Sequence, residues 1–411
     1  MVSPNGPRRP ERSRLRVLVP ALIGLLSVAL SSAAALAEKA NAPIPAATLA
    51  LMAARGTDAA SPIVLRAYKK ESEIEVWKRN AAGRYVPIKT YPICRWSGQL
   101  GPKTKSGDRQ TPEGFYTVAK SQMNPNSRYY LSFDIGYPNA YDRAHGGTGS
   151  AVMVHGVCSS MGCFAMTDAV AGELFSIARE AFSGGQRAFQ FQSFPFRMTA
   201  ANMARHRTDP NIAFWRQLKE GSDRFEATGE EPVVSVSGGR YAFAPSPDPA
   251  KEAAFVALHK DESDRIAGLV DGGAAAVRTT YSDGGQHAFW AARIRQGFPV
   301  GDISRPEALA YAGQEVVLIP ARHRPPPVPE AVWAEWIGRG SPSLALRTTD
   351  FVPPYEAGTD RIAAGVARYV QTSARTYAQT WPSLARAAIE AEMPPPAFTP
   401  LQPQIEKVAQ R

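Results

Sequence analysis

The chain has 411 residues, of which 44% are hydrophobic and 20% are charged. This composition is typical of globular proteins and excludes an intrinsically disordered chain, and the length predicts two or three domains. The formal net charge is +10. Five arginines less one glutamate within the first 16 residues account for 4 of this, and the remaining charge of about +6 favours a location near anionic polymers or phospholipid surfaces. Nucleic acid would suit the same charge, but the sequence contains no recognition motif for it, and we expect no nucleic-acid partner.

The first 37 residues predict a secretory signal peptide. Five arginines lie between Arg8 and Arg16, residues 17–30 are apolar, and residues 35–37 fit a small-x-small cleavage site. The apolar run is shorter than the roughly 20 residues that span a bilayer, which favours cleavage over a membrane anchor. We therefore expect an exported, periplasmic protein with no stable membrane span after cleavage.

Residues 60 to 160 predict a β-rich unit. Residues 63–68 and 74–77 carry β-branched and aromatic side chains in short runs, and residues 80–83 form a hairpin turn signal before the next run. A succession of short strands separated by glycine turns indicates a mixed sheet rather than βαβ repeats.

The run from His155 to Cys163 (HGVCSSMGC) carries the most chemical information in the chain. Apolar residues 151–154 predict a buried strand that delivers the imidazole of His155 from its end. An imidazole at hydrogen-bond range can take the proton of a thiol near neutral pH, which makes Cys163 the candidate nucleophile. Gly162 permits a bend in which the backbone N–H groups of Ser160, Gly162 and Cys163 form an oxyanion hole. The pattern predicts cysteine acyl transfer.

A helix and a further strand are predicted after this run. Thr167 or Asp168 can cap the helix, and Gly184 and Gly185 end it. Its apolar positions follow the helical period and are Val170, Leu174, Ile177, Ala178 and Ala181. The alternating phenylalanines of residues 189–194 then predict a strand that enters the sheet.

The part of the chain beyond residue 245 is less informative. Residues 244–249 have linker composition and predict a domain boundary near residues 244–250. Beyond it, residues 251–270 predict an amphipathic helix, residues 314–319 a strand, and residues 325–329 a stiff connector. A late helix is predicted within residues 362–377. We expect residues 250–411 to form a poorly defined α+β region of unknown function.

The run from His155 to Cys163 resembles the active-site signature of the YkuD-type L,D-transpeptidases, in which His-Gly is followed by Ser-x-Gly-Cys. Further motifs resemble the YafK-like branch of that family in their order and spacing, and they occupy residues 91–94, 107–116, 124–127, 141–144 and 194–198. The resemblance covers about residues 60 to 245. It implies a mainly β, β-sandwich-like catalytic domain with flanking helices. Many members carry Arg or Asn two residues after the cysteine, where this chain has Ala165.

The resemblance implies an L,D-transpeptidase that remodels the cell wall by acting on peptidoglycan stem peptides. Cys163, activated by His155, would attack the amide between an L-centre and a D-centre, and an amine from another stem would resolve the acyl-enzyme. Water in place of that amine would make the protein a thiol amidase that cuts L,D crosslinks or releases a peptidoglycan-linked lipoprotein. Both reactions stay open. A non-catalytic wall-binding protein is the third interpretation, and the intact Cys163 and His155 count against it.

Three charged residues are candidates for binding the substrate. Asp108 and Arg109 could bind the ammonium and carboxylate groups of a peptide stem. The alternative is that both stabilise the turn at Gly107. Arg143 is the third candidate, and its alternative role is an ion pair with Asp142 or another neighbour.

The chain has three cysteines, an odd number. If two of them form a bridge, one thiol stays free, and a free Cys163 leaves Cys94 and Cys158 available to each other. Two separate buried thiols are the alternative. Cys158 is also the rival nucleophile, but it lacks the Ser-x-Gly sequence that precedes Cys163.

The remaining histidines indicate no metal site. His206, His259, His287 and His323 are widely separated and lack the spacing of metal ligands. We expect no metal and no cofactor. We also expect His206, between two arginines, to be a solvated surface residue.

Overall fold

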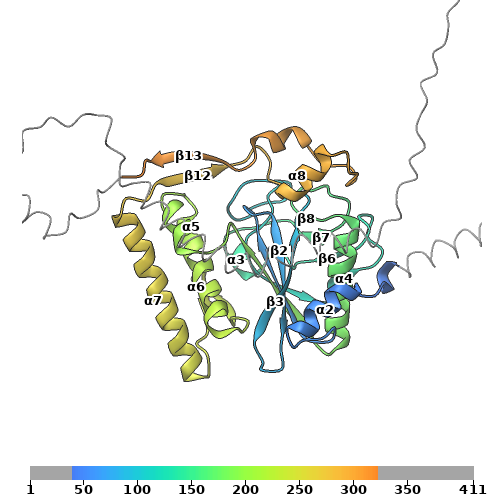
Figure 1. Cartoon of the computed structure of the whole chain (residues 1–411). Helices are drawn as coiled ribbons and strands as arrows, with labels where there is room; N and C mark the ends of the chain where they lie inside the picture. Colours follow the sequence, from blue (N-terminus) through green and yellow to red (C-terminus); the bar gives the residue numbers. More distant parts are fainter. Residues whose placement is uncertain (1–38, 323–411) are drawn as a thin grey trace, which may run out of the picture. The chain divides into compact units, whose positions relative to one another are not determined.

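A computed structural model describes residues 39–322 (Figure 1). The predicted signal peptide, the connector at residues 325–329 and the late helix within residues 362–377 lie outside this range. Within the described range, no helix is both long enough and apolar enough to cross a membrane.

A five-stranded mixed sheet forms the centre of the fold, with strand order β3-β2-β1-β9-β4. Its strands are β1 (Ile63–Tyr68), β2 (Glu73–Arg79), β3 (Tyr85–Pro92), β4 (Gly114–Ala119) and β9 (Ala188–Phe194). β1 pairs in parallel with β9, and the other pairs are antiparallel. Every residue of β1 is buried, because this strand has neighbours on both edges and covered faces on both sides. The predicted strands and the predicted hairpin between β2 and β3 are confirmed.

A second mixed sheet holds the predicted active-site strand. Its order is β5 (Met123–Asn124), β6 (Ser132–Asp134), β7 (Met153–His155) and β8 (Phe164–Ala165), and β7 and β8 are parallel. The predicted strand at residues 151–154 begins later than expected, because Ala151 has a φ of 59° and is exposed.

Aromatic side chains join the two sheets into one core. Phe164 of β8 meets Phe191 of β9 edge to face at 5.0 Å, and Phe133 of β6 meets Phe189 of β9 at 5.8 Å. The two mixed sheets therefore pack face to face, as expected for a β-sandwich-like domain.

Helix α4 (Asp168–Ser183) follows the predicted active-site loop. Thr167 is its N-cap residue and Gly184 its C-cap residue, as predicted, and all but Val170 of the predicted apolar positions are fully buried. The other helices are α2 (Ala46–Ala54), α3 (Ala140–Ala144), α5 (Ala200–Arg205), α6 (Ile212–Thr228), α7 (Pro249–Asp271) and α8 (Ala288–Arg295), with 3-10 turns at Lys120–Gln122 and Pro306–Tyr311. Figure 1 shows α2 and α4 on one side of the large sheet and α5, α6 and α7 on the other.

The residues after 245 pack onto the catalytic part of the chain. β10 (Val234–Ser237) and β11 (Arg240–Phe243) form a hairpin just before residue 245, and β12 (Ala276–Thr280) pairs with β13 (Gln314–Ile319) after it. Between them, α7 packs against α5 and α6, with ion pairs that include Arg224 to Glu252 and Lys219 to Glu262, both at 3.0 Å. Among the described residues, the linker at residues 244–249 therefore lies inside one compact unit.

The prediction that His206 is a solvated residue is wrong. The side chain is fully buried, stacks on the ring of Phe196 at 4.6 Å, and meets Trp215 edge on at 6.0 Å. The turn after α5 directs the imidazole into the core, while the two flanking arginines remain partly exposed.

Candidate active site

Strand β7 places His155 at the centre of the second sheet. The residue is buried between Ser132 of β6 and Ala165 of β8, its register partners. Its Nδ1 lies 2.6 Å from the carbonyl oxygen of Gly156. A carbonyl only accepts hydrogen bonds, so Nδ1 carries the proton and Nε2 of the neutral ring is free to accept one. Burial lowers the pKa of His155, although the bond to Gly156 and the carboxylate of Asp168 oppose this.

Gly156 is required by the close approach of neighbouring segments. A Cβ atom at this position would lie 2.4 Å from Oδ1 of Asp168 and 2.9 Å from Cβ of Tyr130. The same Asp168 oxygen accepts the N–H of Val157 at 2.8 Å. The glycine therefore lets the chain leave β7 directly beside the N-terminus of α4.

Cys163 lies directly before β8, the strand in which Ala165 pairs with His155. The N–H of Met153 donates to its Sγ at 3.4 Å, and Sγ lies 3.9 Å from the carbonyl oxygen of Ala151. Burial raises the pKa of the thiol, while the hydrogen bond from the N–H of Met153 lowers it. The Asp134 carboxylate adds to this increase in pKa, and the Lys103 ammonium opposes it. Since the pKa of His155 is lowered and that of Cys163 is raised, both side chains are neutral in the resting site at neutral pH.

The hydroxyl of Ser160 organises the turn that presents Cys163. It accepts the N–H groups of Cys163 at 3.0 Å and Gly162 at 3.2 Å, and it donates to the carbonyl of Cys163 at 2.7 Å. Gly162 has a φ of 126°, a conformation that side-chain-bearing residues rarely adopt. The N–H of Ser160 donates to Oγ of Ser304 at 3.0 Å. All three N–H groups predicted to form an oxyanion hole are therefore engaged within the resting protein, because the hydroxyl of Ser160 accepts two of them and that of Ser304 accepts the third.

A disulfide joins Cys94 to Cys158, with the two Cα atoms 5.2 Å apart. The hypothesis of this pairing is confirmed, and Cys163 is left as the free thiol. The indole of Trp290 on α8 packs over the bridge and donates to the carbonyl of Pro92 at 2.9 Å. Because its sulfur is bonded and buried, Cys158 is not available as a nucleophile in this oxidised form.

Asp108 makes the hydrogen bonds expected of a turn-stabilising residue. Its carboxylate accepts the N–H groups of Thr104 at 3.0 Å, Lys105 at 2.9 Å and Gln110 at 3.0 Å, and it pairs with the ammonium of Lys103. These bonds support the alternative in which Asp108 stabilises the Gly107 turn.

Arg109 follows with a φ of 59°, and its guanidinium pairs with Asp283 at 2.7 Å. About a third of the Arg109 side chain is exposed. Its backbone lies against the turn that presents Cys163, since a Cβ at Gly162 would lie 3.9 Å from the carbonyl carbon of Arg109. Arg109 therefore lies at the site, but its charge is already paired.

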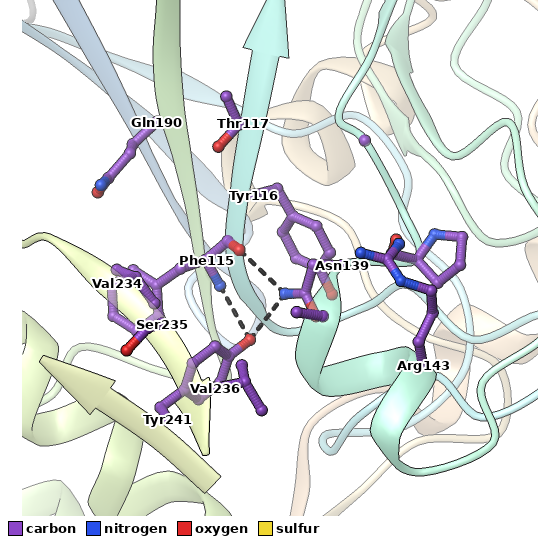
Figure 2. A pocket seen from close by; sticks show the side chains of 13 residues that line it. Phe115, Tyr116, Thr117, Asn139, Arg143, Gln190, Val234, Ser235, Val236 and Tyr241 are labelled. Carbon is purple, nitrogen blue, oxygen red and sulfur yellow. Dashed lines mark hydrogen bonds between the residues drawn. The ribbon is translucent and has the colours of Figure 1, made fainter. Parts of the chain in front are cut away.

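Arg143 lines a separate pocket of about 330 Å³ (Figure 2). Its guanidinium donates to the carbonyl of Pro138. Inside this pocket the Asn139 amide donates to the carbonyl of Phe115 at 2.9 Å and to the hydroxyl of Tyr241 at 2.8 Å. Neither Cys163 nor His155 is among the lining residues. The structure thus does not bring Arg143 together with the predicted catalytic pair.

Other histidines and acids form no metal centre in the described part of the chain. No group of three or more His, Cys, Asp or Glu side chains between residues 39 and 322 could hold a metal ion. His259 instead bonds Asp223 at 2.8 Å, and His287 lies 3.4 Å from Glu73.

Several residues of the site were missed by sequence reasoning. Lys103 and Asp134 act on the thiol through their charges. Asp283 and Ser304 reach the site from residues that we considered uninformative, and Asp283 contacts three arginines, Arg95, Arg109 and Arg305. The only signal in the sequence was the turn pattern Asp-Gly-Gly that begins at Asp283.

Comparison with known proteins assigns the family. Residues 64–184 match the L,D-transpeptidase catalytic domain family YkuD. The chain is 46% identical over 181 residues to YafK of Escherichia coli strain K12, a protein named as an L,D-transpeptidase, and the match covers 44% of this chain and 73% of that protein. The crystal structure of the helical cell shape determining protein Pgp2 from Campylobacter jejuni is also similar. The match covers 57% of this chain and 80% of that protein, at 13% sequence identity and a TM-score of 0.27. This similarity is too low to support conclusions about fold or function. On the sequence matches, this chain belongs to the YkuD-type L,D-transpeptidases, a family that acts on peptidoglycan, and within it to the YafK-like branch.

Proposed function

We propose that this protein is an exported cysteine L,D-transpeptidase that acts on peptidoglycan stem peptides in the periplasm through an acyl-enzyme on Cys163. The observation that carries the proposal is the state of the three cysteines. Cys94 and Cys158 are bonded to each other, while Cys163 keeps a free thiol directly before β8, the strand that pairs with β7 at His155. The chemistry follows from this arrangement.

The resting pair is neutral, so the thiol is activated as it reacts. Nε2 of His155 takes the proton while Sγ of Cys163 attacks the carbonyl carbon of the amide between an L-centre and a D-centre. The C–N bond breaks, a thioester forms on Sγ, and the proton on Nε2 passes to the departing amine. An amine of a second stem then attacks the thioester and gives its proton to Nε2. The new amide leaves, and the proton returns from Nε2 to Sγ.

The N–H groups of Gly162 and Cys163 are the proposed donors to the oxyanion. They converge on the hydroxyl of Ser160 in the resting site, and the Gly162 bond is long at 3.2 Å. Hydrogen bonds at catalytic sites are often rearranged when the substrate binds. We therefore expect the two N–H groups to be shared between this hydroxyl and the oxyanion, whereas the N–H of Ser160 stays bonded to Ser304.

The first test is the mass of the acyl-enzyme. The protein without residues 1–37, and its Cys163→Ala variant, are incubated with tetrapeptide muropeptides. The expected result is a stem-peptide adduct on the wild type only, with loss of D-alanine. An adduct on the variant would remove Cys163 as the nucleophile.

The products then identify the acceptor. A crosslinked dimer indicates transfer to an amine. Shortened monomers alone indicate hydrolysis, which is the thiol amidase alternative. If neither adduct nor product forms, a peptidoglycan-linked lipoprotein is the next substrate to test.

A further inference from the structure

Ser304 lies outside the family match but contacts the nucleophile turn directly. The match ends at residue 184, and Ser304 belongs to the segment between α8 and the 3-10 turn at Pro306–Tyr311. Its Oγ donates to the carbonyl of Ser160 at 2.9 Å and accepts the N–H of the same residue at 3.0 Å. One hydroxyl therefore satisfies both backbone groups of a buried residue.

Ser160 connects this contact to the nucleophile. Its backbone is bonded to Ser304, and its own hydroxyl binds the N–H and the carbonyl of Cys163 at 3.0 and 2.7 Å. A displacement of the Ser160 backbone would therefore displace Cys163. Buried backbone groups that lose their partners must find water, which opens the surrounding loop.

Ser304 is itself held by a buried charge cluster. Its carbonyl accepts Nε of Arg95 at 3.0 Å, and Arg95 Nη2 lies 3.4 Å from Asp283. Asp283 also accepts the N–H of Gly98 at 3.1 Å and binds Arg109 at 2.7 Å. The cluster thus connects the segment that carries Ser304 to two of the loops that surround the nucleophile turn.

We propose that Ser304 is a positioning residue, whose hydroxyl fixes the Ser160 turn and through it the orientation and the shielding of the Cys163 thiol. The proposal rests on Cys163 being the nucleophile of the proposed function. Removal of the hydroxyl should loosen the turn without disturbing the sheets. The thiol, whose reactivity burial suppresses, would then become easier to reach, while attack on a bound substrate would become less well oriented.

The test compares Ser304→Ala, Ser304→Thr and the wild-type chain. Cys163 is the free cysteine of the oxidised protein, so the rate of its alkylation by iodoacetamide between pH 6 and 10 reports its reactivity without any substrate. We expect Ser304→Ala to raise this rate at pH 7.5 by about threefold or more and to lower kcat on muropeptides by about tenfold, with KM within about twofold. Ser304→Thr, which keeps the hydroxyl, should restore both. Ser263→Ala is the matched control, because its hydroxyl bonds only its own helix, at His259.

Hydrogen exchange measured by mass spectrometry separates positioning from folding. The proposal expects faster exchange in Ser304→Ala for peptides that cover residues 156–163, with β1 and β9 unchanged. Faster exchange throughout the protein, or alkylation and exchange identical to wild type, would overturn it. If the wild-type chain turns over no muropeptide, the proposed function fails, but the alkylation profile and the exchange pattern still decide the role of Ser304.

Discussion

The disulfide between Cys94 and Cys158 should contribute several kcal/mol to stability. The two residues are 64 apart in the sequence, and the closed loop includes β4 to β7. In the chain-entropy description, a crosslink over a loop of this length stabilises the folded state by about 4 kcal/mol. For a domain of this size that corresponds to a fall in Tm of about 8–16 °C when the bridge is removed.

The measurement is thermal unfolding of Cys94→Ala/Cys158→Ala beside the wild-type protein, followed by circular dichroism. The Cys163→Ala variant is the control, because it removes a thiol and leaves the bridge. The mass of the wild-type protein before and after reduction confirms that the bridge is present. A decrease in Tm below about 2 °C would refute the reasoning. Activity should fall with stability, since the N–H of Cys94 bonds the carbonyl of Ala165 at 2.9 Å, beside His155.

Three further predictions concern buried charge. Burial lowers the pKa of His206 from 6.5 to about 4. The charges of Lys70 and Arg205 also lower this pKa, whereas the carboxylate of Glu315 raises it. The folded state thus binds fewer protons than the unfolded state between these pH values, so its stability falls as the pH decreases. Between pH 7 and pH 4, the free energy of unfolding measured in urea should fall by about 3 kcal/mol more in wild type than in His206→Phe. Equal decreases in the two proteins would contradict this prediction. Glu113→Gln leaves the ammonium of Lys69, its partner at 2.9 Å, buried without a countercharge. It should cost about 3–5 kcal/mol in urea unfolding, whereas the exposed control Glu307→Gln should cost almost nothing. Asp108→Asn releases Lys103, whose charge lowers the pKa of the Cys163 thiol. Iodoacetamide should then alkylate Cys163 about threefold faster at pH 7.5, and an unchanged rate would exclude this electrostatic effect.

Local patterns predicted most of the catalytic fold. The helical period of the apolar residues and the glycines after them gave the extent of α4, and the Asn-to-Gly turn gave the hairpin between β2 and β3. The glycines of the active-site run were informative because each is required by the local backbone geometry. Gly156 passes too close to Asp168 for any side chain, and Gly162 has a φ of 126°. Such constraints are visible within a few residues of sequence.

Long-range contacts account for what the sequence did not predict. Ser304 and Ser160 are 144 residues apart, and no spacing rule connects them. Asp283 is similarly distant from Arg109. The error at His206 has the same origin, because two neighbouring arginines suggested a surface, while the packing of the turn after α5 on Phe196 decides where the ring lies.

The loop between His155 and Cys163 is held at two points by residues from outside this stretch of the sequence. At Cys158 the bridge reaches back to Cys94, and at Ser160 the backbone is bonded to Ser304. In this loop, Val157 and Cys158 have φ values of 70° and 47°, conformations that cost about 1–3 kcal/mol each in residues other than glycine. Such a backbone persists only where its surroundings over-determine it. Because burial lowers the pKa of His155 and raises that of Cys163, the proposed reaction depends on the relative placement of the two side chains rather than on a preformed thiolate. We therefore expect the bridge and Ser304 to support the proposed reaction by keeping this costly loop conformation in place.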